Sequence, residues 1–111
     1  MIDTAGVADL GELTPFEQAV VDAARSGAAV DSPPGELRAE LIRQLLLGVH
    51  GELDPRGVRL ELATVVGLVD LDDIRTLTRL VMRHCVIPEG VSCSNAHLGE
   101  VDFSHSHLKG P

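Results

Sequence analysis

The chain has 111 residues, of which only 2% are aromatic, and a formal net charge of −8 at pH 7. This length suits one small domain, and the absence of a basic patch and the scarcity of aromatic residues for base stacking argue against direct binding of nucleic acid. No segment is long and apolar enough to span a membrane and the N-terminus lacks the pattern of a secretory signal, so we expect a cytoplasmic protein.

An acidic arm opens the chain, and one helix is predicted within it. Thr14 and Glu17 form a capping box around a proline, an apolar stripe follows at helical spacing, and Gly27 is suited to end the helix. Residues 26–35 are small and contain Gly and Pro, which indicates a linker. We therefore interpret residues 1–34 as an acidic N-terminal arm with one helix and a linker.

A second amphipathic helix is predicted in residues 35–50. Apolar residues recur there at the spacing of one helical face, Pro33 and Pro34 precede them, and Gly48 is a suitable C-cap. The segment is too short to cross a bilayer. Its expected role is to cover the first turn of the repeats that follow, as terminal caps do in repeat proteins.

Residues 51–111 contain a five-residue repeat, in which nine of ten bulky residues are preceded, two positions earlier, by a small or apolar residue, and Arg75 is the exception. In an extended chain both residues of such a pair face the same side, and the residue between them faces water. The pattern predicts a right-handed solenoid, although Ile74 competes with its neighbours for the inward position. The bulky positions are Leu60, Val65, Leu71, Leu77, Met82, Ile87, Cys93, Leu98, Phe103 and Leu108.

The three clearest units, between Ala96 and Gly110, resemble the pentapeptide-repeat family, whose motif places a small residue, a polar residue and then Leu or Phe in each five. The helical segment before the degenerate repeats looks like the beginning of larger bacterial members, particularly actinobacterial ones. The chain thus resembles a short, degenerate member of the family or an N-terminal fragment of a larger one.

This resemblance implies a quadrilateral β-helix with four units per coil, so that the repeats would form about two and a half coils. Residues four units apart would then stack, with Leu60 under Met82 and Ile87 under Leu108. The expected fold is α+β, with N-terminal helices that cap a short right-handed quadrilateral β-helix in residues 51–111.

Four possible zinc ligands lie close together in the sequence: Cys93, His97, His105 and His107. In a solenoid His97 and His107 would project from opposite faces and Cys93 would point inward. We therefore expect no bound metal and no other cofactor.

No catalytic constellation stands out, and the protein is not expected to be an enzyme. Asp72 and Asp73 are adjacent and are interpreted as a solvated turn. Cys85 and Cys93 both occupy inward positions of the repeat, so each is expected to be a buried small hydrophobic residue and not a reactive thiol.

The chain stops directly after a well-formed repeat, so the last coil around Phe103 and Leu108 is expected to be uncovered. Three explanations are open: a fragment of a longer repeat protein, an end-to-end homo-oligomer, or a separate partner that completes the solenoid. The predicted function is therefore a non-catalytic interaction or scaffold module, with Phe103 and Leu108 as the contact surface.

Two alternatives remain. The family resemblance implies the first, a DNA mimic that protects or inhibits a type II topoisomerase, although the outward positions mix both charges over few coils. The second is a metal-dependent activity of the His-rich C-terminal segment.

Overall fold

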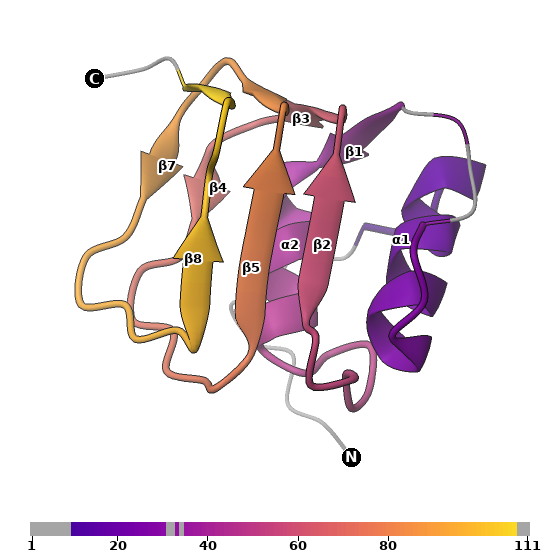
Figure 1. The fold of residues 1–111 in the computed structure, drawn as a ribbon, viewed down its shortest axis with the longest axis horizontal. Coiled ribbons are helices and arrows are strands. Elements are labelled where there is room, and N and C mark those ends of the chain that lie inside the picture. Colours follow the sequence, from indigo (N-terminus) through magenta and orange to yellow (C-terminus); the bar gives the residue numbers. More distant parts are fainter. Residues whose placement is uncertain (1–9, 31–32, 34, 109–111) are drawn as a thin grey trace.

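The computed structural model describes residues 10–30, 33 and 35–108, and it shows two short helices followed by small parallel sheets (Figure 1). The helices are α1 (Pro15–Ser26) and α2 (Ala39–Leu46). The strands are β1 (Glu36–Arg38), β2 (Val58–Glu61), β3 (Thr64–Val66), β4 (Val69–Asp70), β5 (Arg79–Arg83), β6 (Val86–Ile87), β7 (Val91–Ser92), β8 (Glu100–Asp102) and β9 (His107–Leu108).

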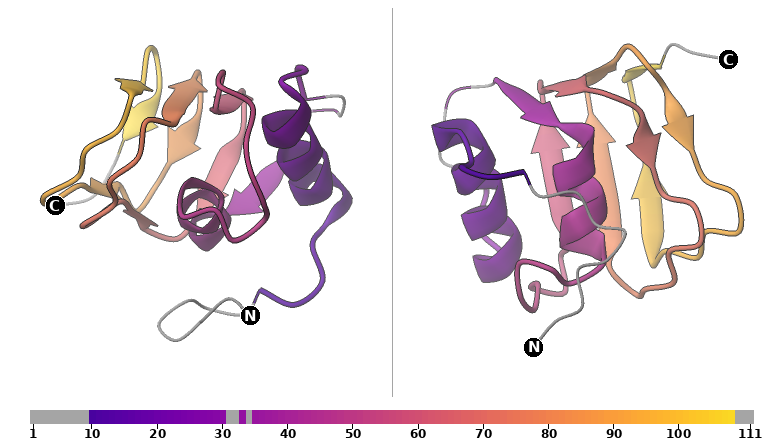
Figure 2. Two further views of the ribbon diagram at one scale, coloured as in Figure 1. Left: turned by 90° about the horizontal axis from the view of Figure 1, so that it is seen from below. Right: turned by 180° about the vertical axis from the view of Figure 1, so that it is seen from behind.

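The strands form three sheets, with the orders β1-β3-β6-β9, β2-β5-β8 and β4-β7, and every pairing is parallel. Consecutive strands between β2 and β7 belong to different sheets. β2, β3 and β4 lie in three sheets, and β5, β6 and β7 then pair with them in the same order. β2, β5 and β8 lie side by side at the front of Figure 1, and α2 lies behind β2 and β5. The views of Figure 2 show α1 at the β1 and β2 end of the molecule, and β8 at the opposite end.

The expectation of a continuous right-handed quadrilateral β-helix is wrong. The strands are two to five residues long and belong to three separate sheets, and the fourth side carries only an isolated bridge between Arg75 and His97. Leu62 and His84, which have positive φ, directly follow the ends of β2 and β5, and Asp73, also with positive φ, lies in the turn between β4 and β5. The described chain is therefore an α+β domain with separate small parallel sheets.

Two of the side-by-side pairs expected from the repeat do occur: Leu60 pairs with Met82 in β2 and β5, and Ile87 pairs with Leu108 in β6 and β9. The register expected near residue 77 is wrong. Leu77 is 93% exposed, whereas Ile74 is 1% exposed and takes the inward position.

Helix α1 has the predicted boundaries. Thr14 Oγ1 accepts the N–H of Glu17, the Glu17 carboxylate accepts the N–H of Thr14, and Gly27 ends the helix with φ of 83°. The apolar stripe of the helix, including Val20 and Ala24, is buried against the rest of the molecule.

The second predicted helix begins later than its apolar pattern indicates, because its first residues form β1. Leu37 pairs with Val65 of β3, and α2 begins only at Ala39. The C-cap is Leu47, and Gly48 follows it with φ of 83°. A strand from the predicted cap thus shares a sheet with strands from the predicted repeats.

A single apolar core joins α1, α2 and the first strands of each sheet. Leu37, Leu41, Ile42 and Leu80 are each at most 1% exposed, and α2 contacts β1, β2 and β4. Burial decreases toward the C-terminal end of the described chain. The inward residues there are only partly buried: Val91, Ala96, Leu98 and Phe103.

Candidate functional site

The last strand of each sheet, β7, β8 and β9, has no strand of the described chain on its outer side. We call these three outer sides together the open edge. An unpaired edge presents a row of backbone N–H and C=O groups that another chain can use. The open edge is therefore the first candidate for a functional surface.

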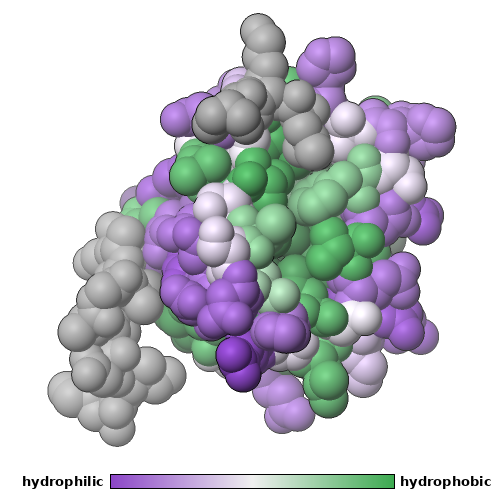
Figure 3. All heavy atoms as spheres, turned by 90° about the vertical axis from the view of Figure 1, so that its left-hand side faces the viewer, coloured by the Kyte–Doolittle hydropathy of each residue, from purple (hydrophilic) through white to green (hydrophobic). Residues whose placement is uncertain are grey.

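Inward side chains at the open edge are incompletely covered. Val58 and Leu80 are fully buried, but Val101, which pairs with Leu80 in the next strand, is 46% exposed. Phe103 and Leu98 are half-buried and contact the core. Figure 3 looks onto this side of the molecule and shows an apolar area with polar side chains around it.

Both residues of the predicted contact surface belong to this edge. Phe103 directly follows β8, and its half-buried ring packs on the core. Leu108 lies in β9, where its backbone pairs with Ile87 of β6, and its side chain lies outside the part of the chain that the structure describes. The contact surface itself stays a prediction, although Phe103 and Leu108 flank the same turn between two edge strands.

The backbone of β8 is oriented so that alternate residues face outward. The N–H of Gly99 donates to the carbonyl oxygen of Thr78, 3.1 Å away. In a parallel ladder the polar groups of successive residues bond to opposite sides, so those of Val101 face β5 and those of Glu100 and Asp102 face away from it. β8 therefore offers two residues with free pairing capacity on its outer side.

The outward side chains of β8 are acidic. Nε of Arg83 lies 3.1 Å from a carboxylate oxygen of Asp102, and Nε of Arg79 lies 3.9 Å from one of Glu100. The hydroxyl and backbone N–H of Ser104 also donate to Asp102. Hydrogen bonds from Ser104 first, and then from Arg83, lower the pKa of Asp102, so this carboxyl group is ionised at neutral pH.

The opposite ends of the sheets, by contrast, are covered. The N–H of Arg38 in β1 donates to the buried carboxylate of Glu17 on α1, 3.0 Å away. Beside β2, the Arg59 guanidinium donates to the carbonyl oxygen of Gly27 over 2.6 Å. We call the outer sides of β1 and β2 the closed edge, because α1 and the residues after it lie along them.

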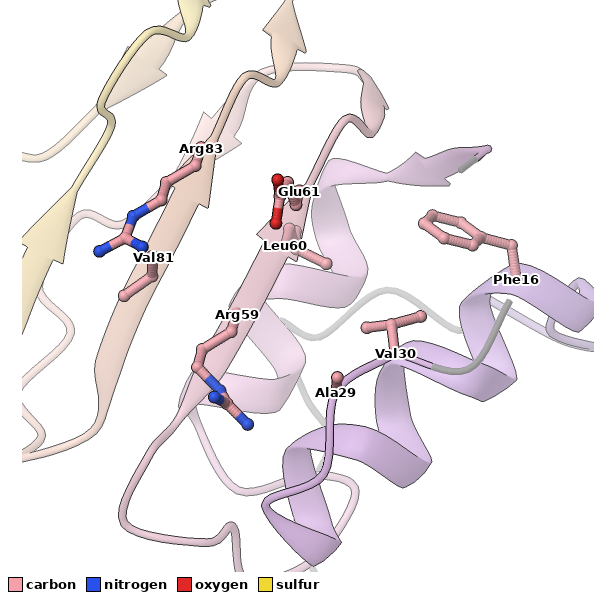
Figure 4. A pocket seen from close by; sticks show the side chains of 8 residues that line it. All are labelled: Phe16, Ala29, Val30, Arg59, Leu60, Glu61, Val81 and Arg83. Carbon is pink, nitrogen blue, oxygen red and sulfur yellow. The ribbon is translucent and has the colours of Figure 1, made fainter. Parts of the chain in front are cut away.

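A pocket of about 250 Å³ lies on the outer face of β2 and β5, opposite Phe16 and Val30 (Figure 4). Arg59 and Arg83 line it, but each guanidinium is already hydrogen-bonded, to the carbonyl of Gly27 and to Asp102 respectively. The pocket therefore has an apolar wall and two guanidinium groups that are already hydrogen-bonded. Its described lining has no pair of groups arranged for acid-base chemistry.

The four candidate zinc ligands do not come together. Cys93 is exposed and does not point inward. The backbone of His97 forms an isolated β-bridge with Arg75, whereas His107 lies in β9, in the sheet of β1, β3 and β6. Among the described residues, no three His, Cys, Asp or Glu side chains gather as a metal site would require.

His105 instead stacks on His84, with ring centroids 4.9 Å apart and planes within 6°. Both residues have positive φ, 54° at His84 and 56° at His105, and they lie at turns one above the other. The sequence analysis missed this stack, because its only signal is the spacing of two non-glycine turn residues.

Asp72 and Asp73 lie in a turn, as predicted. Their side chains connect this turn to the one that contains Ser94 and Asn95. Asp72 accepts the hydroxyl of Ser92 at 2.7 Å and the N–H of Ser94 at 2.8 Å, and Asp73 accepts the side-chain amide of Asn95 at 3.1 Å. The hydrogen bond from Ser92 is the main reason that the pKa of Asp72 is lowered. These carboxylates therefore fasten one turn to another.

No family model, no curated protein and no solved structure matches this chain. The resemblance to pentapeptide-repeat proteins consequently stays a prediction. Within the described residues, no helix has both the length and the apolar character needed to cross a membrane.

Proposed function

We propose that this protein is a non-catalytic interaction module that binds another polypeptide along the open edge, next to Phe103 and Leu108. The main support is that three sheets end on one side in strands without an outer neighbour, while the closed edge is covered. Extended segments bind such edges by adding a strand, with backbone hydrogen bonds for affinity and side-chain contacts for specificity.

The apolar side chains at the edge support the same function. Phe103 is half-buried, and Val101 is 46% exposed although Val58 and Leu80, its counterparts in β2 and β5, are fully buried. A strand added to β8 would remove this apolar area from water at about 25 cal/mol per Å². Binding would thus gain from apolar burial as well as from backbone pairing.

The two alternatives have less support. A DNA mimic requires an extended row of carboxylates, but the acids Glu100 and Asp102 lie beside Arg79 and Arg83 on the same face. A metal-dependent activity would require ligands that converge, and the described part of the chain has no such group.

We also place the protein in the cytoplasm. Both cysteines, Cys85 and Cys93, are free thiols, which fits a reducing compartment.

The test is the binding of short strand-forming peptides to the isotope-labelled protein, followed by NMR chemical shifts, together with light scattering of the protein alone. We expect a peptide or a second copy to shift the amide signals of Glu100 to Phe103. Glu100→Pro removes an outward N–H and should abolish binding, whereas Glu100→Ala keeps this N–H and should retain it. A protein that stays monomeric and binds no peptide would refute the proposal.

A further inference from the structure

We infer that the partner at the open edge is a basic strand, a segment with Lys or Arg at alternate positions and apolar residues between them, and that it adds to β8. This inference rests on the proposed function and names the chemistry of the partner. It follows from the order of charges across β2, β5 and β8.

At two positions of this face opposite charges lie beside each other on adjacent strands, whereas Arg59 of β2 lies beside the uncharged Val81 of β5. Glu61 of β2 pairs in register with Arg83 of β5, and Arg79 of β5 pairs in register with Glu100 of β8. Arg83 also reaches Asp102 of β8 at 3.1 Å. Opposite charges on adjacent strands stabilise a sheet and like charges destabilise it, so this arrangement favours the observed strand order.

β8 is the last strand of this series, and both its outward side chains are acids. A strand on its outer side would place side chains beside Glu100 and Asp102, where cations would form favourable cross-strand pairs with the two acids. The position beside Val101 would face inward over the half-exposed core, where an apolar side chain gains most. The complementary pattern is therefore basic, apolar, basic.

β5 pairs with β8 in part by the same charges: Arg79 lies in register with Glu100, whereas Val81 lies beside Asp102, which Arg83 reaches from two residues further along. It presents Arg79 and Arg83 outward and places Leu80 and Met82 inward, and the two inward residues are fully buried. Its arginines contact the carboxylates of β8 from one side. The outer side of β8 offers the same two acids to a second strand of similar character.

A second copy of this chain fits the open edge poorly. If two copies met with their β8 strands antiparallel and Val101 opposite its equivalent, Glu100 of each would lie opposite Asp102 of the other. Registers centred on either acid also place a carboxylate opposite a carboxylate, which disfavours pairing.

The other arrangement, open edge against closed edge, is blocked in the second copy. There the N–H of Arg38 is already bound by Glu17, and α1 packs against β2, whose Arg59 guanidinium is bound to Gly27. Acids on an edge strand are moreover a common means by which proteins avoid pairing with themselves. The charges and the covering helix thus both favour a different polypeptide.

The experiment compares three heptapeptides of alternating sequence, in which Val alternates with Lys, with Gln or with Glu. Each is titrated into the labelled full chain at low ionic strength. We expect the Lys peptide to bind on the order of tenfold more tightly than the Gln peptide, and the Glu peptide most weakly. Added salt should remove most of the difference, because the charges are exposed.

A charge reversal gives the matched control. Glu100→Lys should weaken binding of the Lys peptide and strengthen that of the Glu peptide. Glu36→Lys makes the same change in net charge at an exposed residue of β1, at the closed edge, and should leave the preference unchanged. Because Glu100 is exposed, the variant is expected to fold, and its thermal unfolding checks this point.

The outcomes separate this inference from the proposed function. Equal binding of the Lys and Gln peptides at the β8 amides would refute the basic partner and leave the interaction module standing. A doubled mass in light scattering that Glu100→Pro returns to the monomer would identify a second copy and overturn this inference alone. Binding of no peptide by a monomeric chain would overturn both.

Discussion

The Glu17 carboxylate and the Arg38 guanidinium meet at two points, with Nε and Nη2 of Arg38 each 2.9 Å from a different carboxylate oxygen. The Glu17 side chain is 1% exposed, and it also accepts the backbone N–H of Arg38. One residue of α1 therefore binds both the side chain and the backbone of β1. This contact holds the helix over the closed edge.

The hydrogen bonds from the Arg38 side chain lower the pKa of Glu17 from 4.5 to about 2, although burial opposes the shift. Because the pKa is lower in the folded state, the contact stabilises the protein above the unfolded pKa and loses this effect as the pH falls toward about 2. We expect Glu17→Gln to lower the free energy of unfolding by about 3 kcal/mol at neutral pH. Urea unfolding at pH 7 and at pH 3 measures the difference, which should shrink at the lower pH.

Gly57 lies where a side chain cannot fit. Its φ is +75°, and an added Cβ would lie 2.3 Å from the carbonyl oxygen of Arg79 in β5. Gly57→Ala should therefore cost about 3 kcal/mol or more in unfolding free energy. Gly48 has a φ of +83° but no atom within 4 Å of its added Cβ, so Gly48→Ala should cost only about 1 kcal/mol. Equal costs in thermal unfolding would contradict the predicted clash.

Ile74 and Leu77 test the observed register. Ile74 is 1% exposed and Leu77 is 93% exposed. Ile74→Ala should lower stability by about 3 kcal/mol through lost burial and a cavity. Leu77→Ala should change stability by less than about 0.5 kcal/mol. Chemical denaturation of both variants decides the matter, since the five-residue spacing taken alone predicts a large effect at Leu77.

The two thiols should differ in reactivity. Cys85 is buried, and its burial raises the pKa of the thiol, whereas Cys93 is exposed. A thiol reagent at pH 8 should modify one cysteine per native chain rapidly and both after denaturation. Cys93→Ser should remove the fast phase, and Cys85→Ser should leave it. A fast phase that survives Cys93→Ser would show that Cys85 is accessible.

Local signals predicted α1 correctly, because the capping box of Thr14 and Glu17 and the terminal Gly27 act within a few residues. β1 was missed because its residues also fit a helical stripe, and only pairing with β3 makes them extended. Such pairing depends on a segment that is distant in the sequence, which local periodicity does not contain. The same dependence explains the later start of α2.

The repeat correctly indicated that Leu60 and Met82 are neighbours, but it did not predict how the backbone turns between strands. Non-glycine residues with positive φ, such as Asp73 and Asn95, make several of these turns, and their short side chains bond to one another. They leave no five-residue signal. For the same reason, the stretch that contains Leu77 was placed in the wrong register and Cys93 was expected inside.

The sequence predicted that Phe103 and Leu108 lie at the end of the strands, but it did not predict the acidic side chains beside them. Phe103 and Leu108 do lie at the end of the sheets, since residues late in a repeat add to the last strands. The acidic character of β8 required the register of Arg79 with Glu100, which only the folded structure provides.

Because α1 covers β1, the two edges of the sheet that contains β1 and β9 are not equivalent. Because the Glu17 carboxylate already accepts the backbone N–H of Arg38 and α1 lies against β1, a strand that is added to the sheet of β1, β3, β6 and β9 can pair beside β9 but meets the helix beside β1. In the binding mode that we propose, this asymmetry disfavours the growth of open-ended chains of copies. Helix α1 covers an edge at which further strands could otherwise pair. A parallel sheet with two free edges has no such protection against fibre growth.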